Sequence, residues 1–228
     1  VFSPSATDPN PTFYVKEAGE YTFKLEVPDN QERQSCFVAK KHLVVVPPLG
    51  IRVELEWHTL GEPQTKAPWT GPSGDVDLHF LHPWATGHDL DGDGAPDGWF
   101  NIPFDCFWFN AHPNWGSYDP AVDDDPHLEA DDTDGGGPEI LNLTAAEDRV
   151  YRVGVHYWGH PRFSPASATV RVHVNDLLAY AAEDVELTYK DMWSVCTIDM
   201  PTGKVEPILD SAGQFKISPD YVNQHFFY

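Results

Sequence analysis

Proline and glycine recur so often along this chain that no long helix fits between them. The 228 residues include 21 prolines and 17 glycines, and both residue types interrupt regular structure. The intervals between them alternate apolar and polar residues with a period of two, most clearly at 51–57, 151–157 and 170–174. This alternation predicts strands with one buried and one solvated face. We therefore expect an all-β fold, a jelly-roll-like β-sandwich whose apolar faces pack together.

The chain is expected to consist of three parts. Prolines and a glycine at 47–50 predict a domain boundary that leaves a short N-terminal segment at 1–47, because such residues mark linkers. A second break at 201–203 ends the predicted sandwich, residues 48–203, and leaves a tail at 204–228. The N-terminal segment is short for a self-sufficient β-domain.

The N-terminal segment carries the motif Ala-Gly-Glu-Tyr-Thr at 18–22, and a strand-like stretch follows it directly. Residues 11–46 resemble the second half of a PKD domain, the immunoglobulin-like sandwich of many bacterial surface proteins. The resemblance implies an incomplete immunoglobulin-like segment, because the first half of that fold has no counterpart here. Either the sequence is part of a longer one, or the missing strands come from the tail at 204–228 or from a neighbouring subunit by strand complementation.

Charge is distributed unevenly along the chain. Asp and Glu number 36 against 14 Lys and Arg, a net charge of −22, and nucleic acid would be repelled by such a polyanion. Acidic residues crowd 75–139, while no Lys or Arg lies between Lys66 and Arg149. Tryptophans and phenylalanines interleave with these acids, and such side chains favour burial. Carboxylates folded among buried aromatics need protons or cations, so we expect bound divalent cations.

The sharpest motif is an Asp-x-Asp-x-Asp-Gly-x-x-Asp loop at 89–97. It resembles the calcium loops of EF-hands, dockerins and thrombospondin type 3 repeats, in which carboxylates at alternate positions converge on the ion and a glycine permits the tight turn. At the twelfth position Phe100 replaces the usual acid, so Asp105 is a candidate for the missing ligand. The alternative is an acidic turn without an ion. The predicted ligands within the loop are Asp89, Asp91, Asp93, the carbonyl of Ala95, and Asp97.

Two further acidic groups are candidate calcium sites. In the second, at 123–139, three glycines let the backbone fold closely around an ion, and the candidate ligands are Asp132, Asp134 and Glu139. A solvated loop is the alternative there. In the third, strand alternation places the candidate ligands Asp75 and Asp77 on one face together with a histidine.

These motifs also occur in a recognisable order. Asp75–Pro83, Asp132–Glu139 and Tyr151–Tyr157 resemble the successive motifs Asp-x-Asp-Leu-His, Asp-Gly-x-Gly-Pro-Glu and Tyr-x-Val-x-Val-x-Tyr of a little-characterised family of bacterial β-sandwiches. The resemblance covers about residues 51–175. It implies an extracellular domain without known catalysis and does not specify a ligand.

Cysteine and histidine add two weaker expectations. We expect a disulfide between Cys106 and Cys196, with Cys36 free or paired outside this chain, although three buried thiols fit the spacing equally well. The 11 histidines show no zinc-binding spacing, and the surrounding carboxylates favour a harder ion.

Sequence signatures of catalysis are missing: there is no Gly-x-Ser-x-Gly and no phosphate-cradling glycine loop. A hydrolase with Asp77 and Asp134 over a tryptophan floor is therefore disfavoured. No apolar run approaches the roughly 20 residues that cross a bilayer. We expect a secreted or cell-surface, non-catalytic calcium-binding module with a structural or adhesive role, such as a filament subunit. The alternative is a lectin-like carbohydrate-binding module.

Overall fold

The structure, a computed structural model, divides the chain into two units, Val1–Pro48 and Leu49–Tyr228. The division falls within the segment 47–50 that predicted a boundary. The residues that the structure describes are 2–3, 7, 10, 12–13, 19–25, 39–45, 50–59, 73–119, 121–133 and 135–223.

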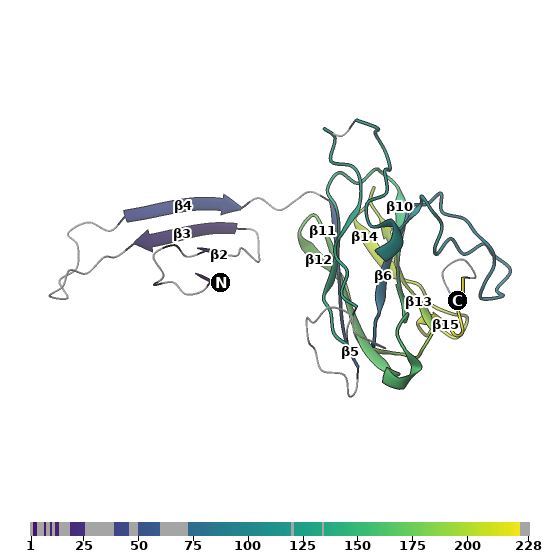
Figure 1. Cartoon of the computed structure of the whole chain (residues 1–228). Coiled ribbons are helices and arrows are strands. Elements are labelled where there is room, and N and C mark those ends of the chain that lie inside the picture. The colour runs from purple at the N-terminus through teal and green to yellow at the C-terminus, as the bar shows by residue number, and fades with distance from the viewer. Residues whose placement is uncertain are drawn as a thin grey trace. The chain divides into compact units, whose positions relative to one another are not determined.

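In the first unit, two antiparallel pairs of strands are described. β1 (Phe2–Ser3) pairs with β2 (Thr12–Phe13), and β3 (Gly19–Leu25) pairs with β4 (Ala39–Val45) (Figure 1). Phe13 packs edge-on against Tyr21 and Phe23, with ring centroids 5.6 and 4.9 Å apart. These aromatic contacts join the two small sheets.

The second unit is a sandwich of two antiparallel sheets that lie face to face (Figure 1). One sheet has the order β12-β11-β5-β9-β8; the other has the order β14-β13-β10-β6-β7, with β15 also on β13. The only helices described are two single 3-10 turns, at Trp108–Asn110 and Pro161–Phe163. The strands are β5 (Ile51–Thr59), β6 (Asp77–Leu81), β7 (Asp105–Cys106), β8 (His127–Ala130), β9 (Glu139–Leu143), β10 (Val150–His156), β11 (Ala166–Val174), β12 (Leu177–Leu187), β13 (Met192–Asp199), β14 (Lys204–Pro207) and β15 (Lys216–Ser218).

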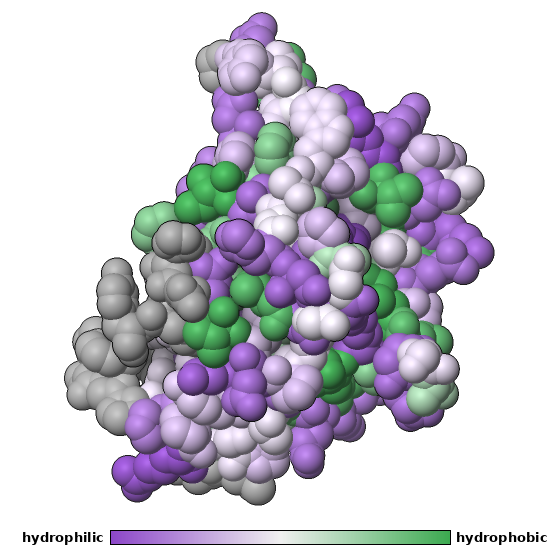
Figure 2. Space-filling view, turned by 90° about the vertical axis from the view of Figure 1, so that its right-hand side faces the viewer, coloured by the Kyte–Doolittle hydropathy of each residue, from purple (hydrophilic) through white to green (hydrophobic). Residues whose placement is uncertain are grey.

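The main core lies between the two sheets and follows the alternation of the sequence. Along β5 and β9 the odd-numbered residues are buried and the even-numbered ones are not, whereas along β11 the even-numbered residues are the buried ones. Facing them, Leu78 and Phe80 of β6 are fully buried. This confirms the all-β sandwich that the period-two pattern predicts. Figure 2 shows one outer face of the molecule, where apolar side chains lie as separate patches among hydrophilic ones.

A second, smaller core covers the outer face of β6. The whole strand is buried, because Leu81 on its outer face packs with Trp99, Phe100 and Phe107. Burial of these three aromatics agrees with the expectation from composition, but Trp84 and Phe109 of the same stretch are each 58% exposed. As a result, polar residues on the outer face of β6 are removed from solvent.

The tail departs from the prediction. Residues 204–228 were expected to form a separate segment that could complete the N-terminal one, but Lys204–Pro207 and Lys216–Ser218 both pair with β13 of the sandwich. Tyr221 then enters the second core. Once β13 is in place, its open edge offers the tail hydrogen-bond partners within a few residues of chain.

The predicted Cys106–Cys196 disulfide is absent. Both residues are buried free thiols, on β7 and β13, and two other strands lie between these in the sheet. Three strand spacings amount to about 14 Å, too far for a disulfide. Cys36 lies outside the described residues.

Candidate metal centres and an adjoining cleft

Three carboxylates meet at one end of the sandwich, where strands begin or end. Oxygens of Asp77, Asp131 and Glu139, hereafter the acidic cluster, all lie within 4.8 Å of one another. Asp77 begins β6 in one sheet, Glu139 begins β9 in the other, and Asp131 directly follows β8. Asp77 and Glu139 are 2% and 0% exposed. The cluster therefore joins the two sheets.

Two oxygens of this cluster lack a hydrogen-bond partner in the described part of the protein. Glu139 Oε2 accepts a hydrogen bond from the backbone N–H of Leu78 at 2.7 Å, but Glu139 Oε1 and Asp77 Oδ2 are buried without one. A buried, unsatisfied charged group is costly. A proton or a cation between these oxygens would remove the cost.

The electrostatic environment opposes ionisation of the cluster. Burial, followed by the charges of Asp75 and Glu139, raises the pKa of Asp77 well above its usual value. Burial likewise raises the pKa of Glu139, and the Leu78 N–H opposes the shift only in part. The pKa of Asp131 is raised by desolvation as well. All three groups would therefore be more stable with a proton or a metal ion bound.

A cleft of about 510 Å³ opens onto the acidic cluster. Asp77 and Asp131 reach its wall, whereas Glu139 is not among the lining residues. Gly159 lets two backbone segments approach beside the cleft: a Cβ there would lie 2.4 Å from the Asp75 nitrogen. Asp75, Trp108, Trp158 and Tyr189 also line the cleft.

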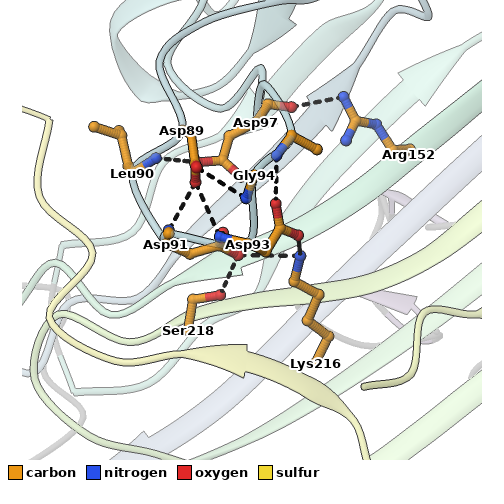
Figure 3. Close-up of polar contacts among 11 residues, drawn as sticks. Asp89, Leu90, Asp91, Asp93, Gly94, Asp97, Arg152, Lys216 and Ser218 are labelled. Carbon is orange, nitrogen blue, oxygen red and sulfur yellow. Dashed lines mark hydrogen bonds and ion pairs between the residues drawn. The ribbon is translucent and has the colours of Figure 1, made fainter. Parts of the chain in front are cut away.

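The 89–97 loop forms the second group of carboxylates. Oxygens of Asp89, Asp91 and Asp97 lie within 4.8 Å of one another, and Figure 3 shows the loop closed around Asp89. Asp89 accepts hydrogen bonds from the N–H groups of Gly92, Asp93 and Gly94 at 2.7, 3.1 and 2.9 Å. Gly94 has a φ of +91°, which glycine adopts readily. The spacing in sequence thus brings three of the four aspartates of the loop together.

Strand β15 adds two residues that the sequence did not reveal. The Lys216 ammonium lies 3.0 Å from Asp91 Oδ2 and 2.5 Å from Asp93 Oδ2 (Figure 3). Ser218 donates a hydrogen bond to Asp91 Oδ2 at 2.9 Å. Both residues lie more than 120 positions from their partners, so no local pattern could have connected them.

Several predicted ligands lie elsewhere. Asp105 does not complete the 89–97 loop: it is fully buried in the second core, where its Oδ2 lies 2.7 Å from His79 Nδ1 and accepts a hydrogen bond from the Phe100 N–H at 2.6 Å. These contacts with His79 of β6 and with Phe100 hold it there. Asp131, rather than the predicted Asp132, supplies the third carboxylate of the acidic cluster.

The remaining predicted ligands have these places. Asp75 lines the cleft and is 7% exposed. Asp93 lies outside the group of three in its loop, because its carboxylate accepts from Ala95 N–H at 2.8 Å and pairs with Lys216. Asp134 lies outside the described residues. No histidine belongs to either carboxylate group in the described part of the chain.

Comparisons with protein-family models, with curated proteins and with solved structures returned no match to this chain. Among the residues that the structure describes, none forms a helix with the length and apolar character needed to span a bilayer.

Proposed function

We propose that this chain is a non-catalytic, calcium-binding module of a secreted or cell-surface protein, with a structural or adhesive role. The observation that carries the proposal is the pair of unpartnered, buried oxygens on Asp77 and Glu139. Calcium binds oxygen ligands at 2.3–2.6 Å, so carboxylate oxygens that lie within 4.8 Å of one another suit a single ion between them.

Calcium fits the acidic cluster better than other common ions. The cluster consists of carboxylates, whereas zinc prefers nitrogen and sulfur ligands. Magnesium demands near-ideal octahedral geometry and keeps several waters. The site lies at one end of the sandwich and takes its ligands from both sheets. Calcium would therefore also stiffen the module, because an ion that binds only the folded state stabilises it.

A second calcium ion is proposed for the 89–97 loop. Three carboxylates converge there, and the amide hydrogen bonds to Asp89 leave the loop already curled. Lys216 pairs with Asp91, one of these three carboxylates, and with the neighbouring Asp93, so calcium would compete with this lysine. We therefore expect the loop to bind more weakly than the acidic cluster.

Calcium titration by calorimetry, together with thermal melts in calcium and in EDTA, tests the proposal. Wild-type protein should bind two ions, and Asp77→Asn and Asp89→Asn should each bind one. Asp148→Asn, an exposed aspartate outside both groups, is the matched control and should bind two. Dissociation constants on the order of 10⁻⁴–10⁻³ M would suit an extracellular module. Absence of calcium binding, or unchanged binding in Asp77→Asn, would refute the assignment.

Assembly through the first unit is part of this proposal. Among the described residues of the first unit, β3 and β4 form a two-stranded sheet in which Leu25 and Leu43 are 62% and 41% exposed, and a two-stranded sheet by itself is marginally stable. A neighbouring chain that added a strand to this sheet would satisfy its edge. Sedimentation velocity should show concentration-dependent association that Leu43→Asp weakens. A monomer at every concentration would contradict this part.

A further inference from the structure

The cleft above the acidic cluster has aromatic walls. Trp108 and Trp158 line it, with ring centroids 5.4 Å apart and planes inclined by 60°. Both side chains are partly exposed. Tyr189 also lines the cleft, but the Lys190 ammonium already stacks on its ring at 5.0 Å. The two tryptophans therefore offer the apolar surface on which a ligand could lie.

A calcium ion in the acidic cluster would retain open positions on the cleft side. Calcium takes six to eight oxygen ligands, and three carboxylates do not fill that number when any of them binds through one oxygen. Glu139 approaches from within the sandwich, while Asp77 and Asp131 lie in the cleft wall. The unfilled positions of the ion would therefore face the cleft and the tryptophans.

We propose that the cleft binds a neutral saccharide, two neighbouring hydroxyls of which complete the coordination of the calcium ion while an apolar ring face stacks on Trp158. This inference rests on the proposed calcium site and names its ligand. Sugars combine paired hydroxyl oxygens, which suit the calcium ion, with an apolar C–H face, which suits a tryptophan ring. The volume of about 510 Å³ lies within the range of small-molecule sites.

Charge selects among saccharides. Asp75 adds a further carboxylate to the cleft wall, and the chain carries a net charge of −22. Three cluster carboxylates outweigh the charge of one calcium ion, so the floor of the cleft stays negative. Acidic sugars such as galacturonate would therefore be repelled, and neutral hexosides would be preferred.

Calorimetry and saturation-transfer NMR on the full chain test this inference. The probes are methyl α-mannoside, methyl β-galactoside and N-acetylglucosamine, with galacturonate and tetramethylammonium as contrasts, followed by an array of neutral oligosaccharides. We expect saturable binding of at least one neutral sugar in calcium and none in EDTA. Trp158→Ala should weaken it by about tenfold or more, with calcium affinity unchanged. Trp84→Ala, an exposed tryptophan outside the cleft, should leave it unchanged.

The outcomes separate this inference from the proposed function. Calcium binding with no sugar bound on any probe or array overturns the saccharide assignment alone, whereas absence of calcium binding overturns both. Sugar binding that persists in EDTA, or that Trp158→Ala leaves intact, refutes the geometry proposed for this cleft. Tetramethylammonium binding that calcium abolishes would instead assign the cleft to an organic cation.

Discussion

The Glu139 carboxylate, at the start of β9 in one sheet, accepts a hydrogen bond from the backbone N–H of Leu78, on β6 in the other sheet, at 2.7 Å. This hydrogen bond links the two sheets of the sandwich at the end where the acidic cluster lies. Its second oxygen has no partner among the described residues. Neutralisation of the cluster is therefore coupled to the packing of the sheets, and an ion bound there should stabilise the whole unit.

Without calcium, stability should fall as pH rises from the usual carboxyl pKa values through the raised pKa values of the acidic cluster. The pKa values of Asp77 and Glu139 in the fold lie above their usual 3.8 and 4.5. Above those usual values the folded chain holds protons that the unfolded chain has released. The free energy of unfolding therefore declines as pH rises through the raised pKa values. Calcium should abolish the decline, because it stabilises the ionised carboxylates. Urea unfolding in EDTA and in calcium across this range measures both slopes.

Asp77→Asn isolates the contribution of the cluster to that slope. Burial lowers the pKa of His156 to about 3 and also lowers that of His82, so these histidines add stability as pH rises and oppose the trend. Wild type and variant both contain these histidines, so the histidine contributions cancel when the unfolding free energies of the two proteins are subtracted. In EDTA at pH 8, Asp77→Asn should be more stable than wild type. If the free energy of unfolding depended on pH equally in the two proteins, ionisation of the acidic cluster would not destabilise the fold.

Gly159→Ala should damage the cleft. The added Cβ would lie 2.4 Å from the Asp75 nitrogen and 2.6 Å from the Ser73 carbonyl oxygen, so the segment that leads into Asp77 must shift. We expect a loss of about 1–3 kcal/mol and weaker calcium binding. At Gly87 an added Cβ would meet only an ordinary contact at 3.6 Å. Gly87→Ala is thus the control, and equal effects of the two substitutions on calcium affinity would contradict the assignment.

Lys216→Met should strengthen calcium binding at the 89–97 loop. Partial burial lowers the pKa of Lys216, but hydrogen bonds to Asp93 and Asp91 raise it by more. The pKa is therefore raised overall, and the ammonium stays charged among these carboxylates. Its removal relieves the positive charge that competes with calcium for these carboxylates. We expect several-fold tighter binding, measured in an Asp77→Asn background where only this loop remains. Weaker binding would show that the lysine supports the loop instead.

The buried cysteines should be inert in the folded protein. Burial raises the pKa values of the Cys106 and Cys196 thiols, and thiolate is the reactive form. In a Cys36→Ser variant, Ellman's reagent should detect no thiol in native buffer and two in denaturant. Reductant should leave the melting temperature unchanged. If the two cysteines did not react with Ellman's reagent in denaturant until reductant was added, they would form a disulfide.

The sequence alone determined the fold class and the local character of each segment. Period-two alternation placed Ile51, Val53 and Leu55 in the core, because strand geometry sends successive side chains to opposite faces. The spacing of Asp89, Asp91 and Asp97 likewise sufficed to bring their carboxylates together, since the three lie within one short loop.

Only the tertiary structure decided which distant groups meet. Glu139 joins Asp77 because two sheets pack face to face, Asp131 lies nearer than Asp132, and Lys216 reaches the 89–97 loop because the tail pairs with β13. Asp105, a neighbour of that loop in sequence, lies instead against His79. Periodicity specifies the face that a side chain occupies but not the strand across from it, since that partner depends on how whole sheets are ordered and packed.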